Sequence, residues 1–232
     1  MDISKAVAVV TGSASGLGLA VAQRVASEGG QVAMLDVNEA QGQEAAEAIG
    51  EHAIFVGTDV SNEEEVNAAV DKAMEVFGSV TLCVNCAGIL GAARVLGRDG
   101  PMPGEYFSKV IQVNLIGTFL MCKAAASAMQ HNEPNEEGER GVIVNTASVA
   151  AFEGQIGQAA YSASKAGVAG MALPLAREFS RLGIRVNTVA PGIFLTPMMA
   201  SMPEEIQASL ASQVPFPSRL GRPEEFADLV AY

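Results

Sequence analysis

The chain has 232 residues, 49% of them apolar, and its 26 acidic residues against 14 basic ones give a formal net charge of −12. A chain of this size and apolar content can bury one full core, which excludes global disorder and predicts a single domain. The acidic balance argues against a nucleic-acid partner, because binding to phosphate backbones needs clustered positive charge and the lysines and arginines here are scattered.

Membrane insertion and secretion are not expected either. No uncharged apolar stretch reaches the roughly 18 residues of a membrane span, and the nearest, from Val110 to Met121, is interrupted by Gln112 and Asn114. The first residues lack the basic region and separate apolar region of a signal peptide. We therefore expect a soluble, cytoplasmic protein without a membrane partner.

Short apolar runs alternate with longer amphipathic segments along the whole chain. The apolar runs are nearly continuous in Val, Ile and Ala, which is typical of strands buried on both faces. They predict strands at residues 6–11, 31–35, 53–56, 80–84, 142–145 and 185–189, with helices at 17–27, 39–49, 63–77, 106–130 and 160–181. This alternation predicts an α/β fold, a Rossmann-type doubly wound parallel sheet in a single domain over residues 1–232. Ser61 is expected to open the third helix in a capping box with Glu64.

The cysteines form a pattern that could suggest redox or metal chemistry. Cys83 and Cys86 make a CxxC, but within a strand two side chains three positions apart point to opposite faces. No second CxxC follows, and His52 and His131 are isolated. We therefore expect structural cysteines, including Cys122, and no metal site.

A glycine-rich turn follows the first predicted strand and opens the first helix. Gly12, Gly16 and Gly18 permit a tight turn and the close approach of an anionic pyrophosphate. The helix N-terminus adds free N–H groups and a positive dipole potential. Because the glycines stand between a strand and a helix in the first βαβ unit, they predict a dinucleotide site.

Asp36 ends the second predicted strand, eighteen positions after Gly18 (36 − 18), where a dinucleotide fold places the residue that reads the ribose. A carboxylate there accepts hydrogen bonds from the ribose hydroxyls and repels a 2′-phosphate. No Arg or Lys stands in the glycine-rich turn or directly after Asp36 to compensate. We therefore predict NAD(H) rather than NADP(H). The alternative, that Asp36 only caps the next helix, is weaker because Asn38 can do so.

Three polar residues in the second half of the chain suggest acid/base chemistry. Tyr161 and Lys165 are four positions apart on one predicted helix and so share a face. A nearby ammonium group favours the phenolate and would bring the Tyr161 pKa down toward neutrality. Ser148, after the fifth strand, can donate a hydrogen bond to a substrate oxygen.

Together these motifs resemble the short-chain dehydrogenases/reductases. The resemblance rests on Gly12-x-x-x-Gly16-x-Gly18, Asn85-Cys86-Ala87-Gly88, Asn114, Ser148, Tyr161-x-x-x-Lys165 and Pro191-Gly192, in this order along the chain. It implies that Ser148 orients the substrate oxygen and that Tyr161 is the general acid/base. Lys165 would lower the Tyr161 pKa and hold the nicotinamide ribose, and Asn114 would support a proton relay through water. Hydride transfer belongs to the nicotinamide.

The resemblance also assigns cofactor contacts by position. Asp59 would meet the adenine amino group, and Phe194 and Thr196 would belong to a loop over the nicotinamide. The complete set is Gly12, Ser15, Gly16, Leu17, Gly18, Asp36, Asp59, Val60, Cys86, Ala87, Gly88, Tyr161, Lys165, Pro191, Gly192, Phe194 and Thr196.

Within the family, several segments look closest to the type 2 3-hydroxyacyl-CoA dehydrogenases, a group also called 17β-hydroxysteroid dehydrogenase type 10. They are residues 132–143, 145–155, 157–161 and 211–221, and the loop 91–104. This implies NAD-dependent interconversion of an L-3-hydroxyacyl-CoA and the 3-oxoacyl-CoA. Two alternatives stay open: another dehydrogenase of the family, acting on a hydroxysteroid, a polyol or an acyl-carrier-protein thioester, and a non-catalytic NAD-binding scaffold.

Substrate contacts are less sharply indicated. Beside Ser148, Gln155 and Gln158 flank the approach to Tyr161, although they could equally be surface residues at a helix start. Positive potential for CoA could come from one of three arginines, and flexible thioethers suit an adaptable acyl slot. The arginines are Arg94, Arg98 and Arg219, and the methionines that carry the thioethers are Met198, Met199 and Met202.

The resemblance carries two structural expectations. Family members usually form a homodimer or homotetramer through the helices expected here at 106–130 and 160–181. They also continue to a seventh parallel strand, so we expect this chain to lack the C-terminal strand of the sheet.

Overall fold

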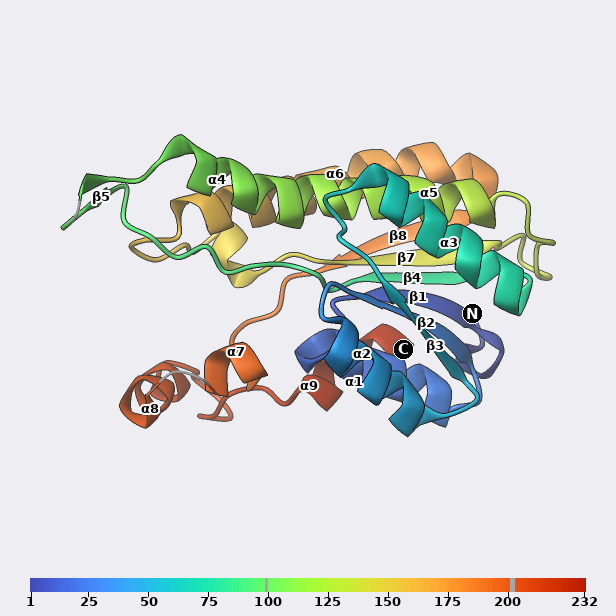
Figure 1. Ribbon diagram of the computed structural model, residues 1–232, viewed down its shortest axis with the longest axis horizontal. Helices are drawn as coiled ribbons and strands as arrows, with labels where there is room; N and C mark the ends of the chain where they lie inside the picture. The colour runs from blue at the N-terminus through green and yellow to red at the C-terminus, as the bar shows by residue number, and fades with distance from the viewer. Residues whose placement is uncertain (99, 201–202) are drawn as a thin grey trace.

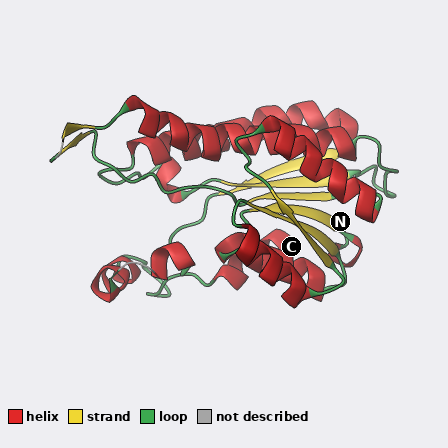
Figure 2. Ribbon diagram, viewed as in Figure 1, coloured by secondary structure: helices red, strands yellow, loops and turns green. Residues whose placement is uncertain are grey.

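A parallel β-sheet organises the chain, and helices cover both of its faces (Figures 1 and 2). The computed structural model describes residues 1–98, 100–200 and 203–232. In this part of the chain the main sheet has six strands in the order β3-β2-β1-β4-β7-β8, all parallel. They are β1 (Val7–Thr11), β2 (Gln31–Asp36), β3 (Ala53–Gly57), β4 (Leu82–Asn85), β7 (Gly141–Thr146) and β8 (Ile184–Val189). The doubly wound α/β prediction is confirmed, and the predicted strand limits lie within two residues of the observed ones.

Alternate strand residues supply two apolar cores, one on each face of the sheet. On β1, Val9 belongs to one core and its neighbours Ala8 and Val10 to the other, as the two-residue period of a strand requires. The first face is covered by α3 (Glu63–Phe77), α4 (Gly104–Ile111), α5 (Gly117–Met129) and α6 (Ala159–Phe179), and the second by α1 (Gly16–Ser27), α2 (Glu39–Ile49) and α9 (Pro223–Ala231) (Figure 1). Burial on both faces explains why the strands are almost continuously apolar.

The strand order reverses beside β1, whose neighbours are β2 on one side and β4 on the other. Loops that leave these strands at their carboxyl ends turn to opposite faces of the sheet, which opens a crevice there. Ligands of doubly wound sheets bind in this crevice. The glycine-rich turn after β1 and the loop after β4 therefore meet where a dinucleotide would lie.

The helix predicted at 106–130 is not a continuous α-helix. A π-helical segment, Gln112–Ile116, separates α4 from α5, and Asn114 lies in its centre, completely buried. A π-helical turn inserts one residue into the helical repeat and is frequently found at functional sites. Residue periodicity did not reveal it, because the segment remains helical on either side.

One helical stretch, Gly104–Met129, is long and apolar enough to cross a membrane by length and composition alone. Its apolar side instead packs into the first core, where Met121, Ala125 and Met129 have no exposed surface. A buried core helix satisfies the same length and composition test. Its apolar character is thus explained by its position against the sheet.

The cap of α3 differs from the prediction by one residue. Asn62, not Ser61, is the N-cap, and its side-chain oxygen accepts hydrogen bonds from the N–H groups of Glu64 and Glu65 at 3.0 and 3.4 Å. The Ser61 hydroxyl donates to Asp59 at 2.7 Å instead. Both residue types can cap a helix, and the turn held by Asp59 decides between them.

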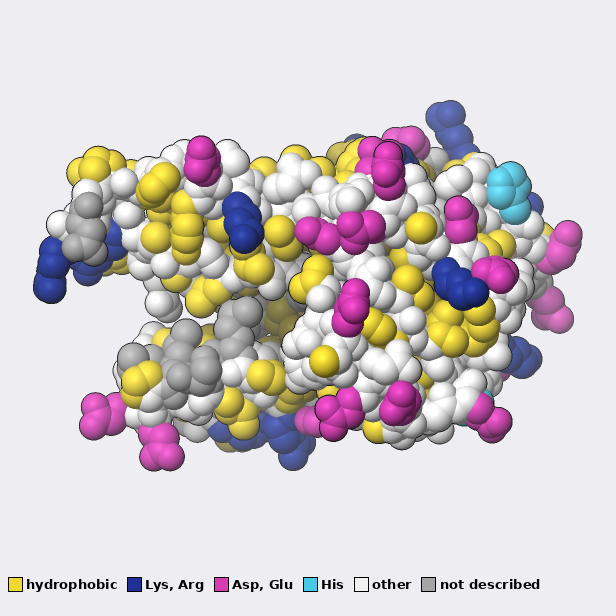
Figure 3. Space-filling model, viewed as in Figure 1, with side chains coloured by type: hydrophobic (Ala, Val, Ile, Leu, Met, Phe, Trp, Pro, Cys, Tyr) yellow, Lys and Arg dark blue, Asp and Glu magenta, His cyan; other side chains and the backbone are white. Residues whose placement is uncertain are grey.

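Two segments for which the sequence predicted no helix or strand project beyond the carboxyl ends of the strands. The first, after β4, contains the hairpin β5 (Leu96–Gly97) and β6 (Gly100–Pro101); the second, after β8, contains α7 (Pro197–Ala200) and α8 (Glu204–Ser212) (Figure 1). The space-filling view shows the surface hollowed between them (Figure 3). This hollow leads toward the crevice at the strand ends.

The second projection is tied to the core at its two ends. Gly221 donates a backbone hydrogen bond to Ile193 at 2.9 Å and accepts one from Leu195 at 2.7 Å. The ring of Phe194 meets the fully buried ring of Phe226 edge-on, with centroids 6.3 Å apart. A side chain at Gly221 would collide with Phe194, so glycine is needed at this junction.

Candidate active site

The glycine-rich turn forms a backbone cradle against the loop after β4. Gly12 has a φ of 64°, and a Cβ there would lie 2.8 Å from the backbone nitrogen of Ala87. A Cβ at Gly18 would lie 2.2 Å from the carbonyl oxygen of Gly12. α1 then begins at Gly16, and the N-cap Ser15 makes no side-chain hydrogen bond to the helix. The turn therefore offers the free N–H groups and close approach that a pyrophosphate needs.

A threonine that the sequence reading missed holds this cradle together. Thr11, the last residue of β1, is buried, and its hydroxyl oxygen accepts hydrogen bonds from the N–H groups of Cys86 and Ala87 at 3.1 and 3.0 Å. It thereby fixes the end of β1 to the segment that follows β4. A single polar residue at the end of an otherwise apolar strand, directly before Gly12, is the signal that could have identified it.

Asp36 lies beside the cradle rather than on a helix end. Its carboxylate accepts hydrogen bonds from the N–H groups of Ala14 and Asn38, both at 3.0 Å. Asn38 is the N-cap of α2 and accepts from Gln41 at 3.3 Å, so the capping alternative for Asp36 is wrong. The carboxylate thus stands at the rim of the phosphate cradle, where it fits an adenosine ribose and would repel a 2′-phosphate.

The remaining candidates for the adenosine side lie on neighbouring strand ends. The carboxylate of Asp59 accepts the N–H and hydroxyl of Ser61 at 2.9 and 2.7 Å, and Val60 is buried against α5. Cys86 follows β4, and its thiol accepts a hydrogen bond from Thr146 at 3.7 Å. The structure brings these residues to the same edge of the sheet as Asp36.

Ser148 and Tyr161 face each other across the end of β7 and the start of α6. The Ser148 hydroxyl is buried and accepts the N–H of Ala150 at 3.1 Å as the cap of a short 3₁₀ turn. It also lies near enough to the Tyr161 hydroxyl to lower the pKa of that group. A substrate oxygen placed between the two hydroxyls could accept a hydrogen bond from one and exchange a proton with the other.

Burial affects the pKa values of both Tyr161 and Lys165. Burial raises the pKa of Tyr161 above its usual value, and the nearby Ser148 hydroxyl lowers it in part. The Lys165 ammonium nitrogen lies 5.8 Å from the centre of the tyrosine ring, over the face of the ring, and donates to the carbonyl of Thr146 at 2.6 Å. Burial also lowers the pKa of Lys165 to about 8. In the protein alone burial therefore has the larger effect on the Tyr161 pKa, and the lowering of that pKa by Lys165 stays a prediction.

The Asn114 side chain connects three elements of the site. Its side-chain oxygen accepts the N–H of Ile89 at 2.8 Å, and its nitrogen donates to the carbonyl of Ile89 at 2.9 Å and to Ser164 at 3.1 Å. Its backbone carbonyl accepts the hydroxyl of Thr118 at 2.8 Å. The side chain is thus occupied in joining the π-helical segment to the loop after β4 and to α6.

The cysteine thiols are suppressed by burial. It raises the pKa of Cys86 to about 11, that of Cys122 to about 12, and that of Cys83 well above its usual value. Thiols held in the protonated form are poor nucleophiles and poor metal ligands. Within the described residues, no group of three or more His, Cys, Asp or Glu side chains is arranged to hold a metal ion.

The loop after β8 contacts both the segment that carries Ser148 and the glycine-rich turn. The Pro191 carbonyl accepts the N–H of Val149, next to Ser148, at 3.0 Å. A Cβ at Gly16 would lie 3.4 Å from a methyl carbon of Thr196, so Thr196 borders the phosphate cradle. Gly192 and Phe194 lie between these contacts along the chain. Of the methionines predicted to cover the substrate, Met202 lies outside the described residues.

The candidate substrate contacts separate into two kinds. Gln158 accepts the backbone N–H of Gln155 at 2.9 Å and so closes the turn before α6, which gives it a structural role. Arg219 forms a two-bond ion pair with Glu225, at 2.9 and 2.6 Å, and that pair lowers the pKa of Glu225 to about 2. Arg94 and Arg98 are exposed on the first projection and are the better candidates for an anionic group.

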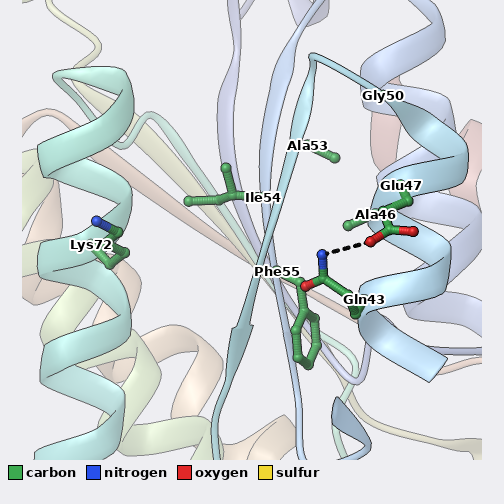
Figure 4. A pocket seen from close by; sticks show the side chains of 8 residues that line it. All are labelled: Gln43, Ala46, Glu47, Gly50, Ala53, Ile54, Phe55 and Lys72. Atoms are coloured by element: carbon green, nitrogen blue, oxygen red, sulfur yellow. Dashed lines mark hydrogen bonds between the residues drawn. The ribbon is translucent and has the colours of Figure 1, made fainter. Parts of the chain in front are cut away.

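A pocket beside the edge strand β3 does not belong to this site. It has a volume of about 460 Å³ and opens beside β3, between α2 and α3, with the Gln43 side chain donating to Glu47 at 3.1 Å (Figure 4). Its lining is Gln43, Ala46, Glu47, Gly50, Ala53, Ile54, Phe55 and Lys72. None of the predicted catalytic or cofactor residues is among them.

Residues 6–207 match the short chain dehydrogenase family, and the chain belongs to it. The fold and the arrangement of Ser148, Tyr161 and Lys165 agree with this assignment, and the protein is an oxidoreductase.

Its similarity is strong to proteins named 3-hydroxyacyl-CoA dehydrogenase type-2. The chain is 50% identical to the one from Drosophila melanogaster over 98% of its own length and 90% of the relative. It is 51% identical to the one from Rattus norvegicus over 97% and 87% of the two chains. The crystal structure of the one from Mycobacterium avium superposes with a TM-score of 0.92 at 44% identity, covering 97% of this chain and 87% of that one. The resemblance inferred from the motifs is confirmed.

The lowered pKa of Lys165 predicts a pH-dependent stability. The usual value is 10.5 and the folded value is about 8, so the unfolded chain binds the proton first as pH falls. As the pH falls from 10.5 to 8, the unfolding free energy of the wild type should therefore decrease by about 3 kcal/mol more than that of Lys165→Met, which lacks the titrating group. Urea denaturation across this range measures the difference. Ser162→Ala, an uncharged change on the same helix, should parallel the wild type; a Lys165→Met curve that does the same would contradict the prediction.

Proposed function

We propose that the protein is an NAD-dependent dehydrogenase that interconverts an L-3-hydroxyacyl-CoA and the 3-oxoacyl-CoA. The observation that carries the proposal is the neighbouring pair of hydroxyls, Ser148 and Tyr161, set beside a phosphate cradle whose rim carries Asp36. The high identity to proteins named 3-hydroxyacyl-CoA dehydrogenase type-2 supports the choice of substrate.

The residues fit NAD as the cofactor. Gly12 and Gly18 lie too close to neighbouring backbone to carry a side chain, which keeps the turn compact, and the N-terminus of α1 would supply N–H donors to a pyrophosphate. Asp36 would accept the adenosine ribose hydroxyls, and Lys165 would donate to the nicotinamide ribose. When bound, the nicotinamide supplies the hydride acceptor or donor.

The two hydroxyls of the site divide the proton chemistry between them. In the reduction, Ser148 donates a hydrogen bond to the carbonyl oxygen, and Tyr161 transfers its proton to that oxygen as it gains charge. In the oxidation, Tyr161 receives the proton of the substrate hydroxyl. The raised pKa of Tyr161 keeps it protonated at neutral pH in the protein alone, which suits it to act as the acid in reduction.

The hollow between the two projections would hold the acyl-CoA (Figure 3). Phe152 and Ile156 are largely exposed in the turn before α6 and offer apolar surface for an acyl chain. Arg94 and Arg98, on the first projection, offer positive charge for the CoA phosphates. A polyanionic ligand can in this way be accepted by a chain whose total charge is −12.

We further propose a cytoplasmic homodimer or homotetramer. Three apolar side chains are exposed on neighbouring helical segments: Ile116 in the π-helical segment, Phe119 on α5 and Leu173 on α6. Apolar surface on neighbouring helices favours association between copies. Light scattering after size exclusion would separate these assemblies from a monomer.

The substrate assignment predicts a clear order of rates. With NADH in excess, acetoacetyl-CoA should be reduced faster than a 3-oxoacyl thioester of acyl carrier protein or a ketosteroid, measured as kcat/KM from NADH absorbance. In the reverse direction, L-3-hydroxybutyryl-CoA should be oxidised and the D-isomer should not. A protein that turns over the ketosteroid but not the CoA ester would contradict the assignment and favour the hydroxysteroid alternative.

Tyr161→Phe should abolish turnover without affecting NADH binding, because it removes only the exchanged proton and one oxygen. We expect kcat to fall by roughly 10²–10⁴-fold, while the NADH dissociation constant, followed by fluorescence, changes little. Tyr106→Phe, on the exposed first turn of α4, is the control and should retain activity. Substantial activity in Tyr161→Phe would exclude Tyr161 as the acid/base, whereas a wild type without turnover would favour the scaffold alternative.

Asp36→Ala should weaken the preference for NAD over NADP. The loss of a charged acceptor and of its repulsion toward a 2′-phosphate corresponds to about 10–100-fold in the ratio of kcat/KM values. Glu44→Ala, an exposed carboxylate on α2, is the matched control. An unchanged ratio in Asp36→Ala would show that another group reads the ribose.

A further inference from the structure

Ser164, directly before Lys165 in the tyrosine-lysine motif, has a hydroxyl that none of the assigned roles uses. It is completely buried in the first half of α6. The hydroxyl donates to the carbonyl of Tyr161 at 2.7 Å and accepts a hydrogen bond from the side-chain nitrogen of Asn114 at 3.1 Å. Serine is a weak helix former, and a buried hydroxyl must be hydrogen-bonded, so these two contacts account for its place there.

Through Asn114 the hydroxyl reaches a third element. The Asn114 side chain is hydrogen-bonded to both backbone groups of Ile89: it accepts from the Ile89 N–H at 2.8 Å and donates to the Ile89 carbonyl at 2.9 Å. The adjacent Gly88 borders the same cluster: a Cβ there would lie 3.1 Å from the Asn114 side-chain oxygen and 3.7 Å from the Lys165 nitrogen. A continuous line of hydrogen bonds therefore joins the loop after β4, the π-helical segment and the turn of α6 that carries Tyr161.

We propose that Ser164 is a positioning residue that fixes the turn carrying Tyr161 to the Gly88–Ile89 loop through Asn114. The proposal rests on the proposed function of this site. It assigns to Ser164 the alignment of the Tyr161 hydroxyl with Ser148 on one side and with the cofactor-facing loop on the other. Reactions between groups held in place are sensitive to displacements of about 1 Å, which can cost roughly 10²-fold in rate.

The chain offers a matched control within the same motif. Ser162, two residues earlier on α6, also has a buried hydroxyl oxygen, but within the described residues it has no hydrogen-bond partner. Ser162→Ala and Ser164→Ala thus make the same chemical change on the same helix. Only the second removes a link to Asn114 and to the Tyr161 carbonyl.

For Ser164→Ala we expect kcat for acetoacetyl-CoA reduction to fall roughly 10–100-fold, with the KM values and the NADH dissociation constant within about threefold of wild type. The pH at which hydroxyacyl oxidation is half-maximal should also rise, because a Tyr161 displaced from Ser148 loses the neighbouring hydroxyl that lowers its pKa. Ser162→Ala should keep the wild-type kcat and pH profile. If both variants behave alike, Ser164 has no positioning role.

Two further measurements keep the result decisive. Should Ser164→Ala fail to fold by circular dichroism, Ser164→Cys preserves the volume with a weaker donor; a kcat and pH profile equal to wild type in that variant would overturn the proposal. Wild type is assayed first: turnover of the ketosteroid or carrier-protein thioester but not of the CoA ester contradicts the substrate assignment alone, and the Ser164 comparison is then made with that substrate. A wild type inactive on all three would overturn both.

Discussion

The hydrogen bonds that the Thr11 hydroxyl accepts from Cys86 and Ala87 are the contact on which the site depends. They bring the loop after β4 so close to the glycine-rich turn that Gly12 cannot carry a side chain. In that loop, Ile89 is hydrogen-bonded to Asn114, and Asn114 is hydrogen-bonded to Ser164 on α6. The phosphate cradle and the catalytic turn, far apart in the sequence, are therefore parts of one hydrogen-bonded assembly at the strand ends.

Burial of that assembly governs its electrostatics more strongly than its charges do. Lys165 is almost completely enclosed, and its ammonium group is directed to the Thr146 carbonyl instead of the Tyr161 hydroxyl. Desolvation disfavours the charged form of each residue, so the pKa of the lysine falls and that of the tyrosine rises. The i, i+4 spacing places both on one helix face, but only the atomic positions decide whether one stabilises the ion of the other.

Much of the fold and of the site could be predicted because the determining signals are local. Apolar runs located the strands, and glycines between a strand and a helix located the cradle. The features that were missed depend on which of several possible hydrogen bonds forms: Asn62 is the cap in place of Ser61 because the Ser61 hydroxyl donates to Asp59. The π-helical segment lies where Asn114 is hydrogen-bonded to Ile89, 25 positions away in the sequence. Arg219 looked available for a ligand until the fold placed it against Glu225.

The sheet forms the candidate cofactor site, whereas the two projections border the hollow, so the fold alone does not determine which substrate is bound. Cofactor recognition depends on strand ends and on backbone geometry, which the sheet holds rigidly, whereas the hollow is bordered by the two projections after β4 and β8. Such loops can change shape without disturbing the strands that carry Ser148 or Asp36, so one scaffold can serve different carbonyl substrates. Gly221 and Phe194 limit this freedom for the second projection, because they join both of its ends to the helix α9 that packs against α1. The position of the second projection is in this way tied to the helix that begins at the glycine-rich turn.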